Sequence, residues 1–186
     1  MLILNQGCSA GSSVDRPVFL SYNFYKNNPL WRKTAMTDYS LLNSQLKALI
    51  HNVPHPIANF ANASALLFQT LEDLNWAGFY LMENGNLVLG PFQGKPACIK
   101  IPLGHGVCGT AAEQDKTQRV DNVHLFPGHI ACDGASNSEI VIPFHRGGAV
   151  AGVLDIDSPL YSRFTEDDRK GLEEFVRIME EELKEP

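Results

Sequence analysis

Three cysteines and three acidic residues are the side chains of this sequence best suited to carry out chemistry. The cysteines lie within one stretch, at Cys98, Cys108 and Cys132. Acids set into apolar runs follow them, at Glu139, Asp155 and Asp157. Free thiols usually reflect reactivity rather than packing, and carboxylates are costly to bury unless they bind something. The combination predicts redox chemistry at a thiol.

Local context favours Cys108 as the reactive thiolate. A short helix is expected over residues 107–114, and Cys108 lies in its first turn, where the helix dipole stabilises negative charge. Asp133 directly follows Cys132 and would raise the pKa of that thiol by like-charge repulsion. Residues 121–138 are polar with few packing residues, so we expect them to form a mobile active-site loop that carries Cys132.

Two other interpretations of the cysteines stay open. Structural zinc sites nearly always contain a close pair of ligands such as C-x-x-C, and this sequence has none, so we expect no metal. Cys98 and Cys108 could each be a small buried hydrophobic residue, whereas Cys132, in a loop of Gly, Ser and Asn, fits a core poorly. Cys8 has no acid or base patterned around it and is interpreted as an incidental exposed thiol.

The acidic residues are expected to converge on one place. Strand periodicity puts Asp155 and Asp157 on the same face, although such a face could simply be solvated. Glu139 opens the neighbouring strand and can reach the same point, and three acids suit a small cation such as an ammonium group. Mutual repulsion can also keep one acid protonated as a proton donor. Trp76 and Tyr80 could add an aromatic wall or be ordinary core aromatics.

The segments that must position these residues are helices around an antiparallel sheet. Apolar stripes at helical spacing occur in residues 41–50 and 57–71. Two β-hairpins are indicated in residues 76–89 and 140–156, with Pro143 suggesting an edge or a bulge. A capping box at Thr165 and Asp168 begins an amphipathic closing helix. This order predicts an α+β fold.

Composition limits the partners of the chain. Its 186 residues, 44% hydrophobic and 19% charged, fit one globular domain with a real core. A net charge of −6 leaves no basic stripe for phosphates, and no apolar run reaches the roughly 20 residues of a membrane span. We therefore expect neither nucleic acid nor membrane as a partner. No signal peptide is recognisable, which favours the cytoplasm, where cysteines are more often catalytic or metal-binding than structural.

The beginning of the chain differs from the rest. Residues 7–16 are small and polar, and the residues after them include aromatics without periodicity. Met36 stands directly before the start of the first expected helix. We therefore expect an extension of uncertain order over residues 1–35 and a catalytic domain over residues 36–186.

Six runs of the sequence resemble the free methionine-(R)-sulfoxide reductases, which are enzymes with a GAF fold. The runs are NWAGFY at 75–80, LGPFQG at 89–94, GVCGTA at 106–111, GHIACD at 128–133, SNSEIV at 136–141 and GVLDIDS at 152–158. The resemblance covers about residues 38–183 and includes all three clustered cysteines at the spacing of the family. It implies a GAF-like fold with a central antiparallel sheet flanked by helices.

The resemblance also implies a role for each thiol. Cys132, rather than Cys108, would be the nucleophile that attacks the sulfur of free L-methionine-(R)-sulfoxide and becomes a sulfenic acid. Cys98 would resolve it by forming a disulfide with Cys132, and Cys108 would be an alternative or second resolving thiol. A thioredoxin-like protein would supply the electrons, and no cofactor is implied. The oligomeric state, including a homodimer, is left open.

The acids and aromatics match positions that bind the substrate in that family. These positions are Trp76, Tyr80, Glu139, Asp155 and Asp157. The acids would divide ammonium binding and proton donation between them, and the indole face would hold the sulfur-bound methyl group. Backbone N–H groups of residues 136–138 are candidate donors to the substrate carboxylate. Peptide-bound methionine sulfoxide should be refused because a closed pocket leaves no room for a flanking chain.

Two alternatives lie outside this reaction. A non-catalytic GAF module would bind a small amino-acid-like ligand without consuming it and would signal through a partner. A peroxide-sensing thiol protein would oxidise Cys132 without forming methionine, but acids near that thiol disfavour its thiolate.

Overall fold

The computed structural model describes residues 37–128 and 134–183. Its elements follow one another as α2 (Tyr39–Ile50), α3 (Pro56–Thr70), β1 (Trp76–Glu83), β2 (Asn86–Gly94), β3 (Lys100–Pro102), α4 (Gly106–Gln114), β4 (Gln118–Val120), the 3₁₀ turn η2 (Val123–Leu125), β5 (Ser138–Arg146), β6 (Ala149–Ser158) and α5 (Glu166–Glu182). The extension predicted over residues 1–35, with Cys8, lies outside the described residues. The domain boundary at residue 36 stays a prediction.

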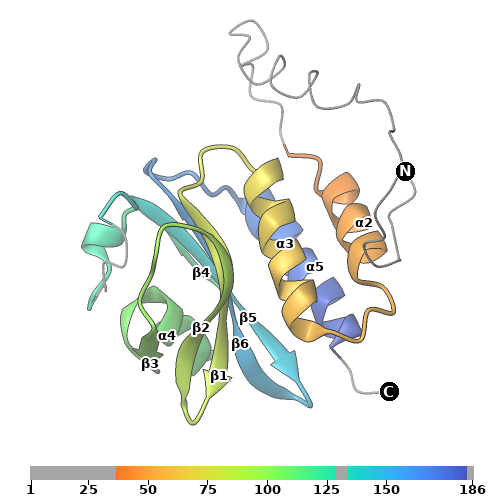
Figure 1. Cartoon of the computed structure of the whole chain (residues 1–186). Coiled ribbons are helices and arrows are strands. Elements are labelled where there is room, and N and C mark those ends of the chain that lie inside the picture. Colours follow the sequence, from red (N-terminus) through yellow and green to blue (C-terminus); the bar gives the residue numbers. More distant parts are fainter. Residues whose placement is uncertain (1–36, 129–133, 184–186) are drawn as a thin grey trace, which may run out of the picture. The chain divides into compact units, whose positions relative to one another are not determined.

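The strands form one antiparallel sheet in the order β3-β2-β1-β6-β5-β4 (Figure 1). Both predicted hairpins are present, since β1 pairs with β2 and β5 pairs with β6. The first turns at Asn84 and Gly85, which both have positive φ angles, as a type I′ turn requires. The α+β fold with a central antiparallel sheet is therefore confirmed, and the central pair β1 and β6 comes from distant parts of the sequence.

Each face of the sheet has its own hydrophobic cluster because side chains alternate along the strands. Helices α2, α3 and α5 cover one face (Figure 1), where Phe79 of β1 and Leu154 of β6 join the larger cluster. Helix α4 lies on the other face, where Cys108 packs with Trp76 and Tyr80. The functional candidates therefore belong to the smaller cluster, and the larger one supports the sheet from behind.

The predicted helix cap and the predicted irregularity at Pro143 are both present, whereas the two short edge strands lie outside the predicted hairpins. The capping box of Thr165 and Asp168 is present at the start of α5. Pro143 lies beyond the residues of β5 that pair with β4, next to an irregularity after Phe144, as an edge or a bulge would require. The short edge strands β3 and β4 were not part of the two predicted hairpins. None of the described helices has the length and apolar character that crossing a membrane requires.

A glycine allows α4 to lie close to β3. A Cβ atom on Gly109 would lie 2.3 Å from the carbonyl oxygen of Pro102. The Gly104 N–H also donates to the Gly109 carbonyl at 2.9 Å, which holds the loop before α4 against the helix. Cys108 precedes Gly109, so the close approach of α4 to β3 fixes the depth of the Cys108 thiol.

The Gly109→Ala substitution should therefore destabilise the protein by about 1–3 kcal/mol, because a fixed backbone oxygen leaves no room for the added methyl group. Urea unfolding measures the change. Glu113→Ala, an exposed position in the same helix, is the matched control and should leave stability nearly unaltered. Equal stability of the two variants would contradict the close approach.

Candidate active site

Strand register brings the predicted acids and aromatics together. Asp157 of β6 lies opposite Trp76 of β1 on one side and opposite Glu139 of β5 on the other. Asp155 lies two residues away on the same face of β6, opposite Gly78 of β1. The expected convergence of the acids is therefore present, and these four side chains project from three adjacent strands.

The aromatic wall is a stack of three rings. The Trp76 ring lies 5.2 Å from Phe92 and 5.8 Å from Tyr80 between centroids, with interplanar angles of 13° and 25°. A Cβ on Gly78 would lie 2.3 Å from the Phe92 Cβ and 2.8 Å from the Trp76 ring, so glycine provides the space for this stack. Sequence reasoning missed Phe92 as a site residue, and its pairing with Gly78 across the first hairpin is the signal that could have found it.

The thiol of Cys108 lies within the acidic cluster. Its residue is 4% exposed, and the thiol donates to Glu139 Oε1 at 3.7 Å. Burial raises the pKa of the Cys108 thiol well above its ordinary value, and the charges of Asp155 and Glu139 raise it further. The prediction that Cys108 is the favoured thiolate is therefore wrong, because burial and two carboxylates outweigh the partial charge of a helix end.

Burial raises the proton affinity of Glu139 and Asp155, and the neighbouring acids raise that of Glu139 further. Burial, followed by the charges of Asp155 and Asp157, raises the pKa of Glu139 well above its ordinary value. Burial raises the pKa of Asp155 to about 6. Glu139 is therefore the acid that most readily keeps its proton near neutral pH, as mutual repulsion predicts.

Two buried polar atoms in the site have no hydrogen-bond partner within the described part of the chain. They are the indole Nε1 of Trp76 and Oδ1 of Asp155. Buried polar groups are nearly always satisfied in a folded protein, so each unpaired atom marks a place where a ligand can bind. One atom is a donor and the other an acceptor, which suits a ligand that carries both kinds of group.

The same cluster contains groups that could hold a metal. The ligand atoms of Cys108, Glu139 and Asp155 lie within 4.8 Å of one another. A metal would need these groups ionised, and the raised pKa values of Cys108 and Glu139 favour their protonated forms. The expectation of no metal stays a prediction.

Cys98 lies beside the aromatic wall. It packs against the smaller core cluster, and its carbonyl oxygen accepts a hydrogen bond from the Tyr80 hydroxyl at 3.0 Å. Cys98 is disulfide-bonded, whereas Cys108 is free. Cys132, the predicted nucleophile, lies outside the described residues, as does the middle of the loop that was expected to carry it.

Part of the predicted carboxylate-binding loop is already engaged. The N–H of Asn137 donates to the carbonyl oxygen of Ser158 at 2.8 Å. The Ser136 hydroxyl accepts a hydrogen bond from the Asn75 amide at 2.9 Å. The Asn137 N–H therefore closes the end of the β5–β6 ladder in this structure, and the expectation that N–H groups of residues 136–138 bind the substrate carboxylate stays a prediction.

The chain is similar to proteins of known structure over most of its length. A family model described as GAF domain matches residues 58–181. The free methionine-R-sulfoxide reductase of Escherichia coli (strain K12) is 53% identical over 145 residues, which are 78% of this chain and 88% of that protein. The structure of fRMsr of Staphylococcus aureus in complex with substrate is 51% identical, with a TM-score of 0.77 over 80% of this chain and 97% of that one. The free methionine-R-sulfoxide reductase of Neisseria meningitidis, solved in complex with its substrate, is 39% identical, with a TM-score of 0.76 over 78% and 87% of the two chains.

The acidic cluster should lower stability at neutral pH, and Asp155→Asn should relieve this cost. Well below pH 4 the carboxyl is neutral in both the folded and the unfolded chain and costs nothing. As the pH rises from about 4, the ordinary pKa of an aspartate in an unfolded chain, to the folded pKa of about 6, the unfolded chain loses its proton first, so stability falls; above the folded pKa the full cost remains. The variant should gain on the order of 2 kcal/mol at pH 8 and much less at pH 4.

Urea unfolding at both pH values measures this gain. Asp121→Asn, at a side chain that is 61% exposed, is the matched control and should show no such dependence. A loss of stability at pH 8 in Asp155→Asn would contradict the cost assigned to the cluster.

Proposed function

Because the chain belongs to the GAF-domain family of free methionine-R-sulfoxide reductases, we propose that it reduces free L-methionine-(R)-sulfoxide to L-methionine. The observation that carries the proposal is the cluster of buried Glu139 and Asp155 with half-buried Asp157 beside the Trp76 ring, on a chain that is 53% identical over 145 residues to such a reductase. An acidic cluster suits the ammonium group of a free amino acid, and a peptide nitrogen offers no such charge.

The acids divide into two roles in this proposal. Asp155 and Asp157 hold the substrate ammonium in their ionised forms. Glu139, whose pKa is raised most clearly, donates a proton to the sulfoxide oxygen. The unpaired Nε1–H of Trp76 provides a further donor to the substrate, and the ring stack holds the methyl group on sulfur.

In this proposal the thiols supply the two electrons that reduce the sulfoxide to a thioether. The Cys132 thiolate attacks the sulfoxide sulfur, the oxygen is protonated and passes to Cys132 as a sulfenic acid, and methionine leaves. Cys98 then attacks the sulfenic sulfur, which releases water and forms the Cys98–Cys132 disulfide. The disulfide-bonded state of Cys98 and the free, high-pKa thiol of Cys108 support this division.

Cys108 acts after that disulfide forms. As a protonated thiol it donates to Glu139 during the chemical step, and it later serves as the second resolving thiol toward an external reductant. A thioredoxin-like reductant and a cytoplasmic location are parts of this proposal, and a homodimer stays open.

Substituting the cysteines tests the thiol chemistry. Cys132→Ser should abolish methionine formation from free methionine-(R)-sulfoxide with dithiothreitol as reductant, because no nucleophile remains. Cys98→Ser should still form about one methionine per protein in a single turnover but should stall in steady state. Cys8→Ser is the matched control and should behave as the unsubstituted protein.

Three outcomes would redirect the proposal. Binding of the sulfoxide without consumption, unaffected by Cys132→Ser, would indicate the non-catalytic sensor. Oxidation of Cys132 by peroxide with no methionine formed would indicate the peroxide-sensing alternative. Full steady-state turnover by Cys98→Ser would remove Cys98 from the resolving role.

The ring stack should determine which sulfur epimer reacts. Trp76→Ala removes the surface that holds the methyl group and should reduce the preference for R over S by about tenfold or more, whereas Trp76→Phe should retain part of it. Chiral chromatography of the remaining sulfoxide measures the ratio. An intact preference in a folded Trp76→Ala variant would refute the assignment.

A further inference from the structure

Two buried serines lie at the edge of the acidic cluster without a role in the reaction described above. Ser138 opens β5 and Ser158 ends β6, and the two residues lie opposite each other. Both are 0% exposed. The next pair along the ladder is Glu139 with Asp157, so the serines are one position from two of the functional acids.

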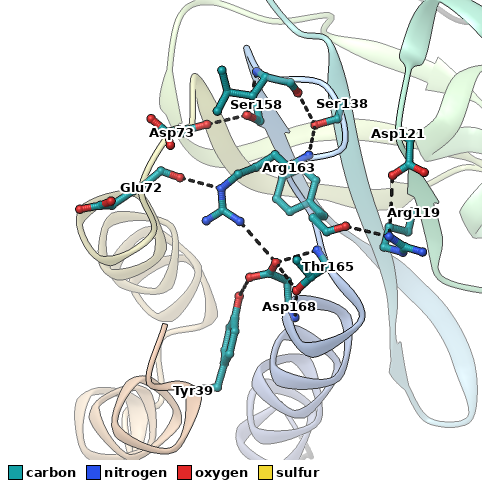
Figure 2. A network of polar contacts seen from close by, with 12 residues as sticks. Tyr39, Glu72, Asp73, Arg119, Asp121, Ser138, Ser158, Arg163, Thr165 and Asp168 are labelled. Atoms are coloured by element: carbon teal, nitrogen blue, oxygen red, sulfur yellow. Dashed lines mark hydrogen bonds and ion pairs between the residues drawn. The ribbon is translucent and has the colours of Figure 1, made fainter. Parts of the chain in front are cut away.

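The two hydroxyls hold the same turn from both sides. The Ser138 hydroxyl donates to the carbonyl oxygen of Leu160 at 2.6 Å and accepts from the Arg163 N–H at 3.3 Å. The Ser158 hydroxyl accepts from the Leu160 N–H at 3.0 Å and donates to the carbonyl oxygen of Asp73 at 2.6 Å. The serines therefore join the ends of β5 and β6 to the segment that leads into β1 and Trp76 (Figure 2).

The side chain of Arg163 fastens this turn to the helices. Its Nε donates to the Glu72 carbonyl oxygen at 3.1 Å, and its Nη1 pairs with Asp168 at 3.3 Å. Asp168 caps α5 and also accepts a hydrogen bond from the Tyr39 hydroxyl of α2 at 2.6 Å. Figure 2 shows these contacts together with those of the two serines.

We propose that Ser138 and Ser158 are positioning residues of the reductase site, which hold the ends of β5 and β6 so that Glu139 and Asp157 stay beside Trp76. This inference rests on the proposed function. The Glu139–Asp157 pair is the second in its ladder, and the Trp76–Asp157 pair ends the pairing between β1 and β6. Ends of strands open most easily. Like charges gathered there repel each other, so the strands need an added constraint.

The test compares two half-reactions. In one, reduced protein forms methionine in a single turnover; in the other, oxidised protein is re-reduced by dithiothreitol. Ser138→Ala and Ser158→Ala should lower the second-order rate constant of the first about 10- to 100-fold, because small displacements of reacting groups cost that much. The rate of re-reduction should not change, since it needs no substrate site.

A matched serine separates positioning from stability. Ser64 is also 0% exposed, and its hydroxyl donates to two carbonyl oxygens, at 2.8 and 3.1 Å, but it lies in α3, outside the β5 and β6 strand ends and the network described above. Ser64→Ala should lose stability while keeping the methionine-forming rate. Ser138→Thr, which retains the hydroxyl, should recover much of the rate lost in Ser138→Ala.

If the serine variants fail to fold, a substitution at Arg163, a less buried residue of the same network, provides the test. Arg163→Gln removes the contact to Glu72 at a side chain that is 16% exposed, and it should lower the same rate constant in the same direction. If folded variants of Ser138, Ser158 or Arg163 form methionine as fast as Ser64→Ala, the positioning role is overturned while the proposed function stands. Failure of the unsubstituted protein to form methionine would instead overturn the proposed function.

Discussion

The repulsion between buried carboxylates is the constraint on which the site depends. Glu139 and Asp155 are 7% and 6% exposed, and Asp157 lies next to both on the same face of the sheet. Charges placed this closely in a medium of low polarity cannot all ionise at neutral pH without a cation between them. Without a cation the cluster therefore favours a proton on one acid, and in the proposed function the cation is the substrate ammonium group.

Such a cluster needs a rigid support, which the rest of the fold provides. The acids stand on the central strand β6 and its neighbour β5, and three helices pack behind these strands. On the acidic side, α4 and the ring stack of Trp76, Tyr80 and Phe92 belong to the smaller cluster that covers the sheet. Hydrophobic burial on one face thus offsets the electrostatic cost on the other.

Much of this arrangement follows from local patterns in the sequence. Alternation along β6 predicts that Asp155 and Asp157 share a face, and the turn residues Asn84 and Gly85 predict the first hairpin. These predictions succeed because strand geometry has a fixed period of two. The position of Glu139 beside them followed from its place at the start of the neighbouring strand in the same hairpin.

Long-range features escaped the same reasoning. The pKa of Cys108 depends on burial and on acids that lie more than 30 positions away, which local helix geometry cannot reveal. The stacking of Phe92 on Trp76 required the register of the hairpin. The serine network joins residues separated by up to 129 positions, as between Tyr39 and Asp168, and no periodic pattern marks such contacts.

The hydrogen bond from the Tyr80 hydroxyl to the Cys98 carbonyl gives the site an internal optical reporter. In the proposed reaction a disulfide at Cys98 opens and closes, and a backbone movement at Cys98 would reach Tyr80 through this hydrogen bond. Tyr80 stacks on Trp76, and indole emission responds to the distance and polarity of neighbouring groups. The colour and intensity of tryptophan fluorescence would then follow the oxidation cycle without any added dye.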